Sequence, residues 1–496
     1  MTGTLYGVGL GPGDPELMTV KAARLISEAS VIAYHCARHG RSIARSVAEP
    51  YLREGQLEEK LVYPVTTETT DHPGGYEGAI ADFYELSAKR LAEHLDAGRD
   101  VVLLCEGDPF FYGSYMYMHE RLAGRFEAVV VPGVTSVSAA SSVFGRPLVQ
   151  RDEVLTVLPG TLPAPELARR LADTDAAAVL KLGRTFSSVR EAFAEAGKLD
   201  DAVYVERATW GQQRIEPLAS VDPSTVPYFS LALLPSPAYA SRQSSPASPP
   251  AAAPSAGEVV VVGLGPAGPE WLTPEAASEL DAAEHIVGYG PYVARVPQKA
   301  GQQRHASGNR VEADRAREAL SLAASGSRVA VVSSGDPGVF AMASAVLEQL
   351  SAGHGAGVRV RIVPGVTAAQ AAASRVGAPL GHDYCVLSLS DRLKPWEIIE
   401  KRLDAAGAAD LVLALYNPAS RTRTTQLADA RAVLLRHRSA GTPVVVARDV
   451  GGPEEDIRIT TLGELEPSTV DMRCLLIVGS SRTRSDNGIV WTPRGY

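Results

Sequence analysis

Gly9-Leu-Gly-Pro-Gly-Asp-Pro-Glu-Leu-Met-Thr19 returns in the second half of the chain as Gly263-Leu-Gly-Pro-Ala-Gly-Pro-Glu-Trp-Leu-Thr273. Two further loops recur behind it in the same order: Glu106-Gly-Asp-Pro109 with Ser334-Gly-Asp-Pro337, and Val131-Pro-Gly-Val-Thr135 with Val363-Pro-Gly-Val-Thr367. We call these the first, second and third loop of each copy. The distance between equivalent loops is much longer than a solenoid repeat, and the order of the loops is the same in both copies. The pattern therefore indicates a duplicated module rather than a solenoid.

The spacing between the copies shows where they differ. Equivalent positions are 254 residues apart at the first loop, 228 at the second and 232 at the third. The N-terminal copy therefore carries about 26 extra residues between its first and second loops, in the stretch from roughly Arg38 to Asp100. Related chemistry on different substrates would suit one scaffold with one altered segment, although drift could produce the same pattern.

Composition limits the class of protein. The chain of 496 residues is too long for one core and suits two modules of two lobes each. A net charge of −9 argues against a nucleic-acid partner, and no apolar run approaches the roughly 20 residues of a membrane span. Four scattered cysteines indicate neither a disulfide framework nor a metal site. We therefore expect a cytoplasmic protein without a membrane partner.

A stretch rich in proline, alanine and serine, Pro235 to Gly257, divides the chain. It has almost no large apolar residues and cannot bury enough surface to order itself. The predicted organisation is a first module over 1–234, a linker over 235–257 and a second module over 258–485.

Short β-branched runs alternate with helical patterns in both copies. Strands are predicted over Thr4–Leu10, Val31–Tyr34, Asp100–Cys105, Val154–Leu158, Ala178–Lys181 and Ala202–Glu206, and over Glu258–Leu264, Ile286–Val287, Arg328–Ser333, Cys385–Leu389, Leu411–Tyr416 and Val444–Ala447. Helices are predicted over Val20–Ala29, Ala79–Ala97, Pro274–Ala283 and Val311–Ala324. Such alternation predicts α/β lobes with a parallel sheet, two lobes to each copy.

The loops do not match the common nucleotide-binding motifs. Pro12 and Pro266 interrupt the glycine pattern of a dinucleotide site, and no Gly-Lys-Ser/Thr of a P-loop is present. All three loops follow strands, so they should gather at the carboxyl ends of a parallel sheet. Proline stiffens these turns and glycine permits close approach, so the loops can present main-chain groups to a ligand.

At these residues the chain resembles the tetrapyrrole (class III) S-adenosylmethionine-dependent methyltransferases of cobalamin and sirohaem synthesis. The resemblance implies tandem tetrapyrrole methylase modules, each with S-adenosyl-L-methionine in a cleft between its two α/β lobes. In the first module it implies cofactor contacts from Pro12, Glu106, Gly107, Asp108, Phe111, Thr135, Ser136 and Leu182. In the second it implies contacts from Pro266, Ser334, Gly335, Asp336, Val339, Thr367, Ala368, Tyr416 and Asn417.

Other residues separate the two copies. Cys105-Glu-Gly-Asp-Pro-Phe-Phe-Tyr-Gly-Ser114 and the longer segment before the second loop resemble the precorrin-2 C20-methyltransferase branch. Ser388-Leu-Ser-Asp391 and Tyr416-Asn-Pro-Ala-Ser-Arg421 are similar to the precorrin-3B C17-methyltransferase branch. The resemblance implies a bifunctional enzyme of vitamin B12 synthesis that methylates precorrin-2 at C20 and precorrin-3B at C17 with ring contraction.

Two classes of alternative stay open. The chain could be a class III methyltransferase acting on cobalt-precorrins, ribosomal RNA or diphthamide. One half could instead be a non-catalytic tetrapyrrole-binding module. A homodimer is possible, and the sequence does not decide it.

Candidate catalytic residues are fewer than candidate binding residues. His35 stands where precorrin-2-producing relatives carry an aspartate, so it could act as a base, or be structural. Asp383 and Asp391 are the corresponding polar candidates in the second copy, with turn capping as the alternative. The carboxylates of a precorrin require cations, because guanidinium groups match carboxylates bidentately. The candidates for this role are Arg146, Arg184, Arg392 and Arg421.

Overall fold

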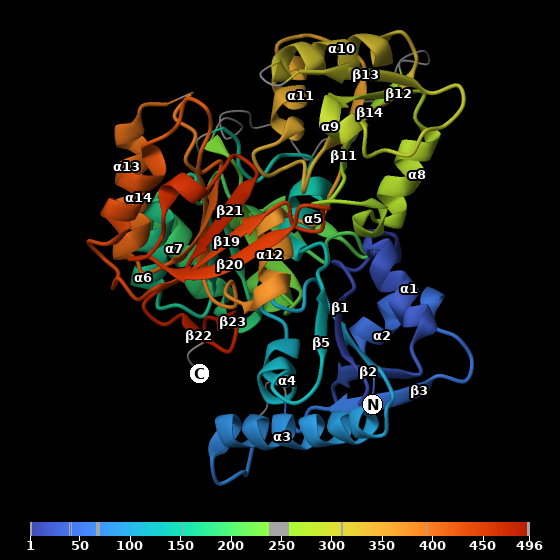
Figure 1. The fold of residues 1–496 in the computed structure, drawn as a ribbon, viewed down its shortest axis with the longest axis vertical. Coiled ribbons are helices and arrows are strands. Elements are labelled where there is room, and N and C mark those ends of the chain that lie inside the picture. The colour runs from blue at the N-terminus through green and yellow to red at the C-terminus, as the bar shows by residue number, and fades with distance from the viewer. Residues whose placement is uncertain are drawn as a thin grey trace.

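The computed structural model describes residues 2–38, 40, 42–65, 70–151, 153–237, 257–308, 311–392 and 394–493. Both copies fold as α/β modules of two lobes each, as the alternation of strands and helices predicts (Figure 1). Of the predicted linker, residues 238–256 lie outside the described part of the chain. No helix in the described ranges is both long and apolar enough to cross a membrane.

The first lobe of each module contains a five-stranded parallel sheet, and the strand order is the same in both modules. In the N-terminal module the order is β3-β2-β4-β1-β5, and in the C-terminal module it is β13-β12-β14-β11-β15. The N-terminal strands are β1 (Leu5–Gly9), β2 (Val31–Cys36), β3 (Leu57–Val62), β4 (Val101–Cys105) and β5 (Ala128–Val131). The C-terminal strands are β11 (Glu258–Gly263), β12 (His285–Tyr289), β13 (Gln303–Ser307), β14 (Arg328–Ser333) and β15 (Arg359–Val363).

Helices cover these two sheets. The N-terminal lobe has α1 (Val20–Glu28), α2 (Ile43–Ala48), α3 (Gly75–Asp96) and α4 (Tyr115–Leu122), and the C-terminal lobe has α8 (Pro274–Ala282), α9 (Gly290–Val293), α10 (Glu312–Ala324) and α11 (Met342–Ser351). Thr19 begins α1, because its hydroxyl accepts a hydrogen bond from the Ala22 amide at 3.2 Å.

The extra residues of the first copy lie where the loop spacing predicts them. Residues 37–100 connect β2 to β4, whereas 290–327 connect β12 to β14. About a third of the difference is in the helix that precedes the last strand of each connection, since α3 has 22 residues and α10 has 13. In Figure 1, α3 runs along the lower edge of the N-terminal lobe.

The second lobes are joined in one sheet. Strands β6 (Leu155–Pro159), β7 (Ala176–Leu180), β8 (Val203–Glu206), β9 (Arg214–Pro217) and β10 (Ser230–Leu234) belong to the N-terminal module. Strands β17 (Tyr384–Ser388), β18 (Val412–Tyr416), β19 (Pro443–Arg448), β20 (Asp456–Thr461) and β21 (Cys474–Val478) belong to the C-terminal module. Antiparallel pairing of β6 with β17 makes a continuous ten-stranded sheet, β20-β19-β21-β18-β17-β6-β7-β10-β8-β9.

Helices α6 (Ala164–Ala172), α7 (Phe186–Glu195), α13 (Trp396–Ala408) and α14 (Gln426–Leu434) belong to the second lobes. The helices that follow the third loops, α5 (Ser136–Phe144) and α12 (Ala368–Val376), lie between the two modules. One apolar cluster contains Val137 and Leu148 of the first module together with Val366, Tyr384 and Val445 of the second. The two modules therefore share a core.

The C-terminal module continues past residue 485, where the predicted boundary lies. Strands β22 (Arg484–Asp486) and β23 (Ile489–Trp491) form a hairpin, and β23 pairs with the short strand β16 (Gly377–Ala378). The turn of the hairpin is Asn487-Gly488, with φ of +48° and +79°. This dipeptide is typical of a tight hairpin turn and is a sequence signal for these strands that the predicted boundary at 485 did not take into account.

Candidate functional site

The three loops of each module meet through their glycines. A Cβ on Gly133 would lie 2.1 Å from the Gly107 carbonyl oxygen, and one on Gly9 would lie 2.6 Å from the Gly133 nitrogen. The first and second loops also pair, because the Gly107 amide donates to the Gly11 carbonyl at 2.8 Å. The C-terminal module repeats this contact set at Gly263, Gly265, Gly335 and Gly365. Glycine is required here because the backbones touch where a side chain would stand.

A buried aspartate joins the second loop to the third. Asp108 accepts hydrogen bonds from the Phe110 amide at 3.0 Å and from the Gly133 amide at 3.1 Å. Asp336 does the same with Gly338 and Gly365, at 2.8 and 3.2 Å. Burial raises the pKa of Asp108 to about 7 and that of Asp336 to about 6. Both carboxyls, predicted as cofactor contacts, are thus occupied in holding the loops together.

The glycine of each second loop leaves space in front of it. Gly107 and Gly335 have φ of +66° and +67°, a region that side chains rarely adopt. No heavy atom lies within 4 Å of a Cβ built on Gly107, and the nearest atom to one built on Gly335 is 3.7 Å away. These two positions can therefore present bare backbone to a ligand.

The third loops begin helices. The Thr135 hydroxyl caps α5 by accepting from the Ser138 amide at 3.2 Å, and Thr367 caps α12 by accepting from the Gln370 amide at 3.2 Å. Ser136 and Ala368 are the first residues of those helices. These four predicted contacts therefore lie beside the glycine-rich loops.

The second lobe of each module contributes the residue that follows a strand. Lys181, after β7, and Asn417, after β18, both have left-handed backbones, with φ of +61° and +51°. The Tyr416 hydroxyl accepts from the Ala369 amide at 3.3 Å, which brings Tyr416 to the start of α12. Leu182 is buried in the apolar core around α6 and α7, so any contact that it makes with a ligand comes from its backbone.

Tryptophans connect the first loops to the second lobes. In the N-terminal module the Trp210 indole donates to the Pro12 carbonyl at 2.8 Å, and a Cβ on Gly13 would overlap the Trp210 ring. In the C-terminal module the tryptophan is on the loop itself, where Trp271 packs against Gly451. The sequence analysis missed both contacts, because a tryptophan in a loop carries no positional signal.

Arg295 is a further residue that the sequence analysis missed. Its guanidinium donates to the Gly265 carbonyl at 2.8 Å, to the Leu264 carbonyl at 3.1 Å and to the Ser334 hydroxyl at 3.0 Å. It also donates to the carbonyl of Ala267, in the same first loop that contains Pro266. Burial lowers the pKa of Arg295 to about 10.

The N-terminal module has an acidic group at the position of Ser334. There Glu106 accepts a hydrogen bond from the Ala44 amide at 3.1 Å. Equivalent places in the two modules therefore carry different groups, a guanidinium beside Ser334 and a carboxyl at Glu106, whose pKa is raised by burial.

Two residues predicted as cofactor contacts also pack between the modules. The ring of Phe111 lies edge-on to Tyr384, with 5.9 Å between centroids. Val339 forms a backbone bridge with Val149 of the N-terminal module. The duplicated second loops therefore face the opposite module, which the sequence of one copy does not reveal.

His35 lies on β2 within a cluster of aromatic rings. It stacks on Tyr63 at 5.3 Å and lies 5.9 Å from Phe83, both of which belong to the longer connection of the first copy. The Tyr63 hydroxyl shares a 2.6 Å hydrogen bond with Ser114, which places the cluster next to the second loop. Within the described part of the chain, His35 Nε2 is buried without a hydrogen-bond partner.

The structure separates the two carboxyls predicted in the second copy. Asp383 precedes β17 and forms an ion pair with Arg170 of the N-terminal module. Asp391 follows the other end of β17 and accepts from the Gln426 side chain at 2.7 Å. Five strand residues span roughly 17 Å, so Asp383 is not brought to Tyr416 and Asn417. The prediction of Asp383 as an acid–base group is corrected to a role in packing the modules.

The predicted substrate arginines are mostly on the surface. Arg184, Arg392 and Arg421 are exposed, and the Arg146 guanidinium stacks 4.9 Å above the Phe144 ring. No group of His, Cys, Asp and Glu side chains among the described residues is arranged to hold a metal ion.

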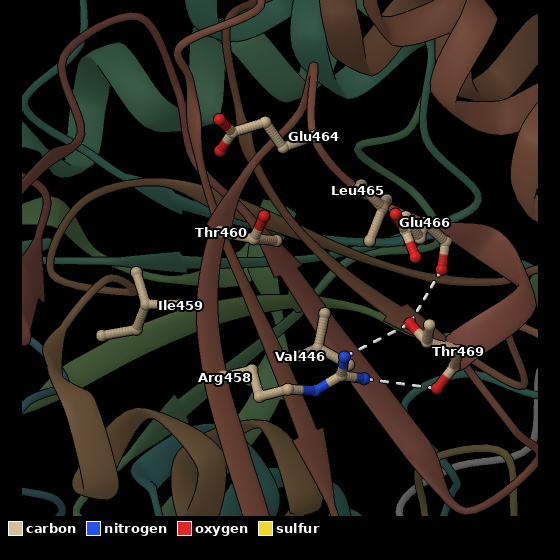
Figure 2. A pocket seen from close by; sticks show the side chains of 8 residues that line it. All are labelled: Val446, Arg458, Ile459, Thr460, Glu464, Leu465, Glu466 and Thr469. Carbon is tan, nitrogen blue, oxygen red and sulfur yellow. Dashed lines mark hydrogen bonds between the residues drawn. The ribbon is translucent and has the colours of Figure 1, made fainter.

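A cavity of about 360 Å³ lies elsewhere, along β19 and β20 at the end of the ten-stranded sheet (Figure 2). Its polar groups bond to one another, since Arg458 donates to the Thr469 carbonyl at 3.2 Å and Thr469 donates to the Glu466 carbonyl at 2.9 Å. None of the predicted site residues lines it.

Comparison with known proteins follows the duplication. The family model for tetrapyrrole (corrin/porphyrin) methylases matches residues 4–222 and again 258–466. The cobalamin biosynthesis protein CobIJ of Mycobacterium tuberculosis is 61% identical over 502 residues, covering all of this chain and 96% of the relative.

Two Sinorhizobium proteins each align with just under half of the chain. The precorrin-2 C(20)-methyltransferase is 52% identical over 47% of the chain and 95% of its own length. The precorrin-3B C(17)-methyltransferase is 47% identical over 48% of the chain and 97% of its own length. With both copies matched and one relative aligned throughout, the chain belongs to the tetrapyrrole methylase family.

Proposed function

We propose that the chain is a bifunctional S-adenosyl-L-methionine-dependent C-methyltransferase of corrin-ring synthesis. The N-terminal module methylates precorrin-2 at C20, and the C-terminal module methylates precorrin-3B at C17 and promotes ring contraction. The observation that carries the proposal is that one three-loop site is built twice, in a chain 61% identical to a CobIJ protein over its whole length.

The residues around the loops suit a cofactor held mainly by backbone. The space in front of Gly107 and Gly335 allows close approach, while Asp108 and Asp336 keep the second and third loops in place. S-adenosyl-L-methionine would supply an activated methyl group there. The task of the protein is then chiefly alignment, which alone lowers the barrier of a bimolecular transfer substantially.

A base for the N-terminal module is proposed at His35. The geometry supports this proposal, because Nε2 is buried without a hydrogen-bond partner among the described residues. Burial lowers the pKa of His35 to about 4, so the imidazole is neutral at pH 7 and is a weak base that suits a strongly acidic proton. Replacing His35 with alanine should lower the kcat of C20 methylation and change its pH profile. A His35→Ala enzyme with unchanged kcat and pH dependence would show that the histidine only fills the aromatic cluster.

In the C-terminal module the proposed acid–base group is Asp391. It lies beyond the same strand ends as Tyr416 and Asn417, since the Asn417 side chain donates to Ser388 at 3.0 Å and Asp391 follows three residues later. The side chain of Arg423 lies 3.6 Å from it. The exposed arginines Arg392 and Arg421 are proposed to meet substrate carboxylates.

The experiment uses the full chain with labelled methyl donor and either precorrin-2 or precorrin-3B. Precorrin-2 should gain one methyl at C20, and precorrin-3B should gain one at C17 and contract. A bulky substitution, Gly107→Trp, should abolish only the first reaction, and Gly335→Trp only the second. Cobalt-loaded substrates run in parallel decide whether the ring carries a metal. Methylation at another carbon, or loss of both reactions with either glycine variant, would refute the assignment.

A further inference from the structure

We propose that the N-terminal module positions the second loop of the C-terminal module, which contains Asp336. Methyl-donor binding in the C-terminal half would then depend on Val149 and Ser138 of the N-terminal half. The inference deepens the proposed function and rests on it. It concerns residues that lie outside the C-terminal module altogether.

The first observation is a backbone bridge between modules. The Val149 amide donates to the Gly338 carbonyl at 3.2 Å, and the Phe340 amide donates to the Val149 carbonyl at 3.2 Å. Val149 is buried, with 1% of its surface exposed. The bridge therefore adds a strand-like partner to the second loop just behind Asp336, the residue that holds this loop to the third.

The second observation concerns Asp336 itself. Burial raises the pKa of Asp336 to about 6, and the Ser138 hydroxyl, in α5 of the N-terminal module, acts in the opposite direction. Ser141, on the same helix, lies against the loop as well, since its oxygen would be 3.2 Å from a Cβ on Gly338. Helix α5 of the opposite module thus packs on the loop that contains Asp336.

The dependence is one-sided. The equivalents of Val149 and Val339 in the opposite direction are Gly381 and Phe111, by the spacing of the copies. Among the described residues, no backbone bridge joins that pair, and the Gly381 amide donates within its own module to Ala378 at 3.1 Å. The ring of Phe111 lies against Tyr384 of the C-terminal module. The second loop of the N-terminal module is therefore contacted by a side chain of the other module, whereas the second loop of the C-terminal module receives backbone hydrogen bonds from it.

The test measures each site separately in the full chain. Gly107→Trp leaves only the C-terminal site for calorimetric titration with S-adenosyl-L-methionine, and Gly335→Trp leaves only the N-terminal site. In each background Val149→Pro removes the amide donor, and Val149→Ala is the matched control that keeps it. Ser138→Ala is a second variant that deletes one hydroxyl and leaves the backbone unchanged.

We expect Val149→Pro to raise the Kd of the C-terminal site at least about fivefold, which corresponds to the loss of one hydrogen bond. The N-terminal site should stay within about twofold, and Val149→Ala should resemble its parent in both backgrounds. Ser138→Ala should also weaken the C-terminal site. An unchanged C-terminal Kd in both Val149→Pro and Ser138→Ala, or equal weakening of both sites, would overturn the inference. Absence of binding in the parent single-site variants would instead refute the proposed cofactor.

Discussion

Two glycines of the N-terminal site can be distinguished by what an added methyl group would meet. Gly107 has open space in front of it but a φ of +66°, whereas a Cβ on Gly133 would lie 2.1 Å from the Gly107 carbonyl oxygen. Gly107→Ala should therefore keep the fold and lose the ligand. Gly133→Ala should lose the loop arrangement itself.

The magnitudes follow from these contacts. A non-glycine residue in the left-handed region costs about 1 kcal/mol, so Gly107→Ala should lower the Tm of this 496-residue chain by only about 1–2 °C. At Gly133 the backbone must move by about 1 Å, with an over-packing cost of about 1–3 kcal/mol. The same shift weakens the bond from the Gly133 amide to Asp108, for about 1.5–3 kcal/mol more.

The assay combines thermal unfolding with titration of S-adenosyl-L-methionine in the Gly335→Trp background, where only the N-terminal site binds. Gly107→Ala should raise the Kd at least about tenfold, because a methyl group occupies the space of close approach. Gly133→Ala should show the larger fall in Tm. Normal binding by Gly107→Ala would refute the proposal that the cofactor approaches this glycine, and parental stability of Gly133→Ala would refute the packing argument.

Three further predictions concern charged groups. Arg295→Met should weaken methyl-donor binding in the C-terminal site about tenfold. Arg304→Met is the control, because it removes another guanidinium of the same lobe that binds carbonyl groups, and it should leave the binding unchanged. Equal effects of the two variants in a titration would contradict a specific role for Arg295. Because burial raises the pKa of Asp108 to about 7, its protonated form stabilises the fold at acid pH, and this stability is lost as pH rises toward 7. Between pH 5 and pH 8 the free energy of unfolding, measured with urea, should therefore fall less in Asp108→Asn than in the parent. Asp383→Ala should cost about 1–3 kcal/mol of unfolding free energy, because Arg170 loses its partner at the module interface but keeps its ion pair with Glu166. Adding Arg170→Met should recover part of this free energy, and no recovery would argue against the pair.

The parts of the molecule that local sequence determines were predictable. The duplicated loops, the alternation of strands and helices and the longer connection over residues 37–100 all appear in the structure. Glycine and proline restrict the backbone directly, and apolar periodicity reports which face is buried, so a short window of sequence carries these features. The hairpin at Asn487-Gly488 had a signal of the same kind.

The relations between the modules were decided only by the tertiary structure. Three contacts between the modules join residues that are far apart in the chain. They are the pairing of β6 with β17, the ion pair of Asp383 with Arg170, and the backbone bridge from Val149 to the second loop of the C-terminal module. Neither partner of such a pair carries a mark of the other, because an aspartate before a strand looks the same whether it faces a substrate or a buried arginine. Which of the two it faces depends on how two modules of the same fold pack against each other. That packing follows from the shape and burial of whole surfaces rather than from any single segment.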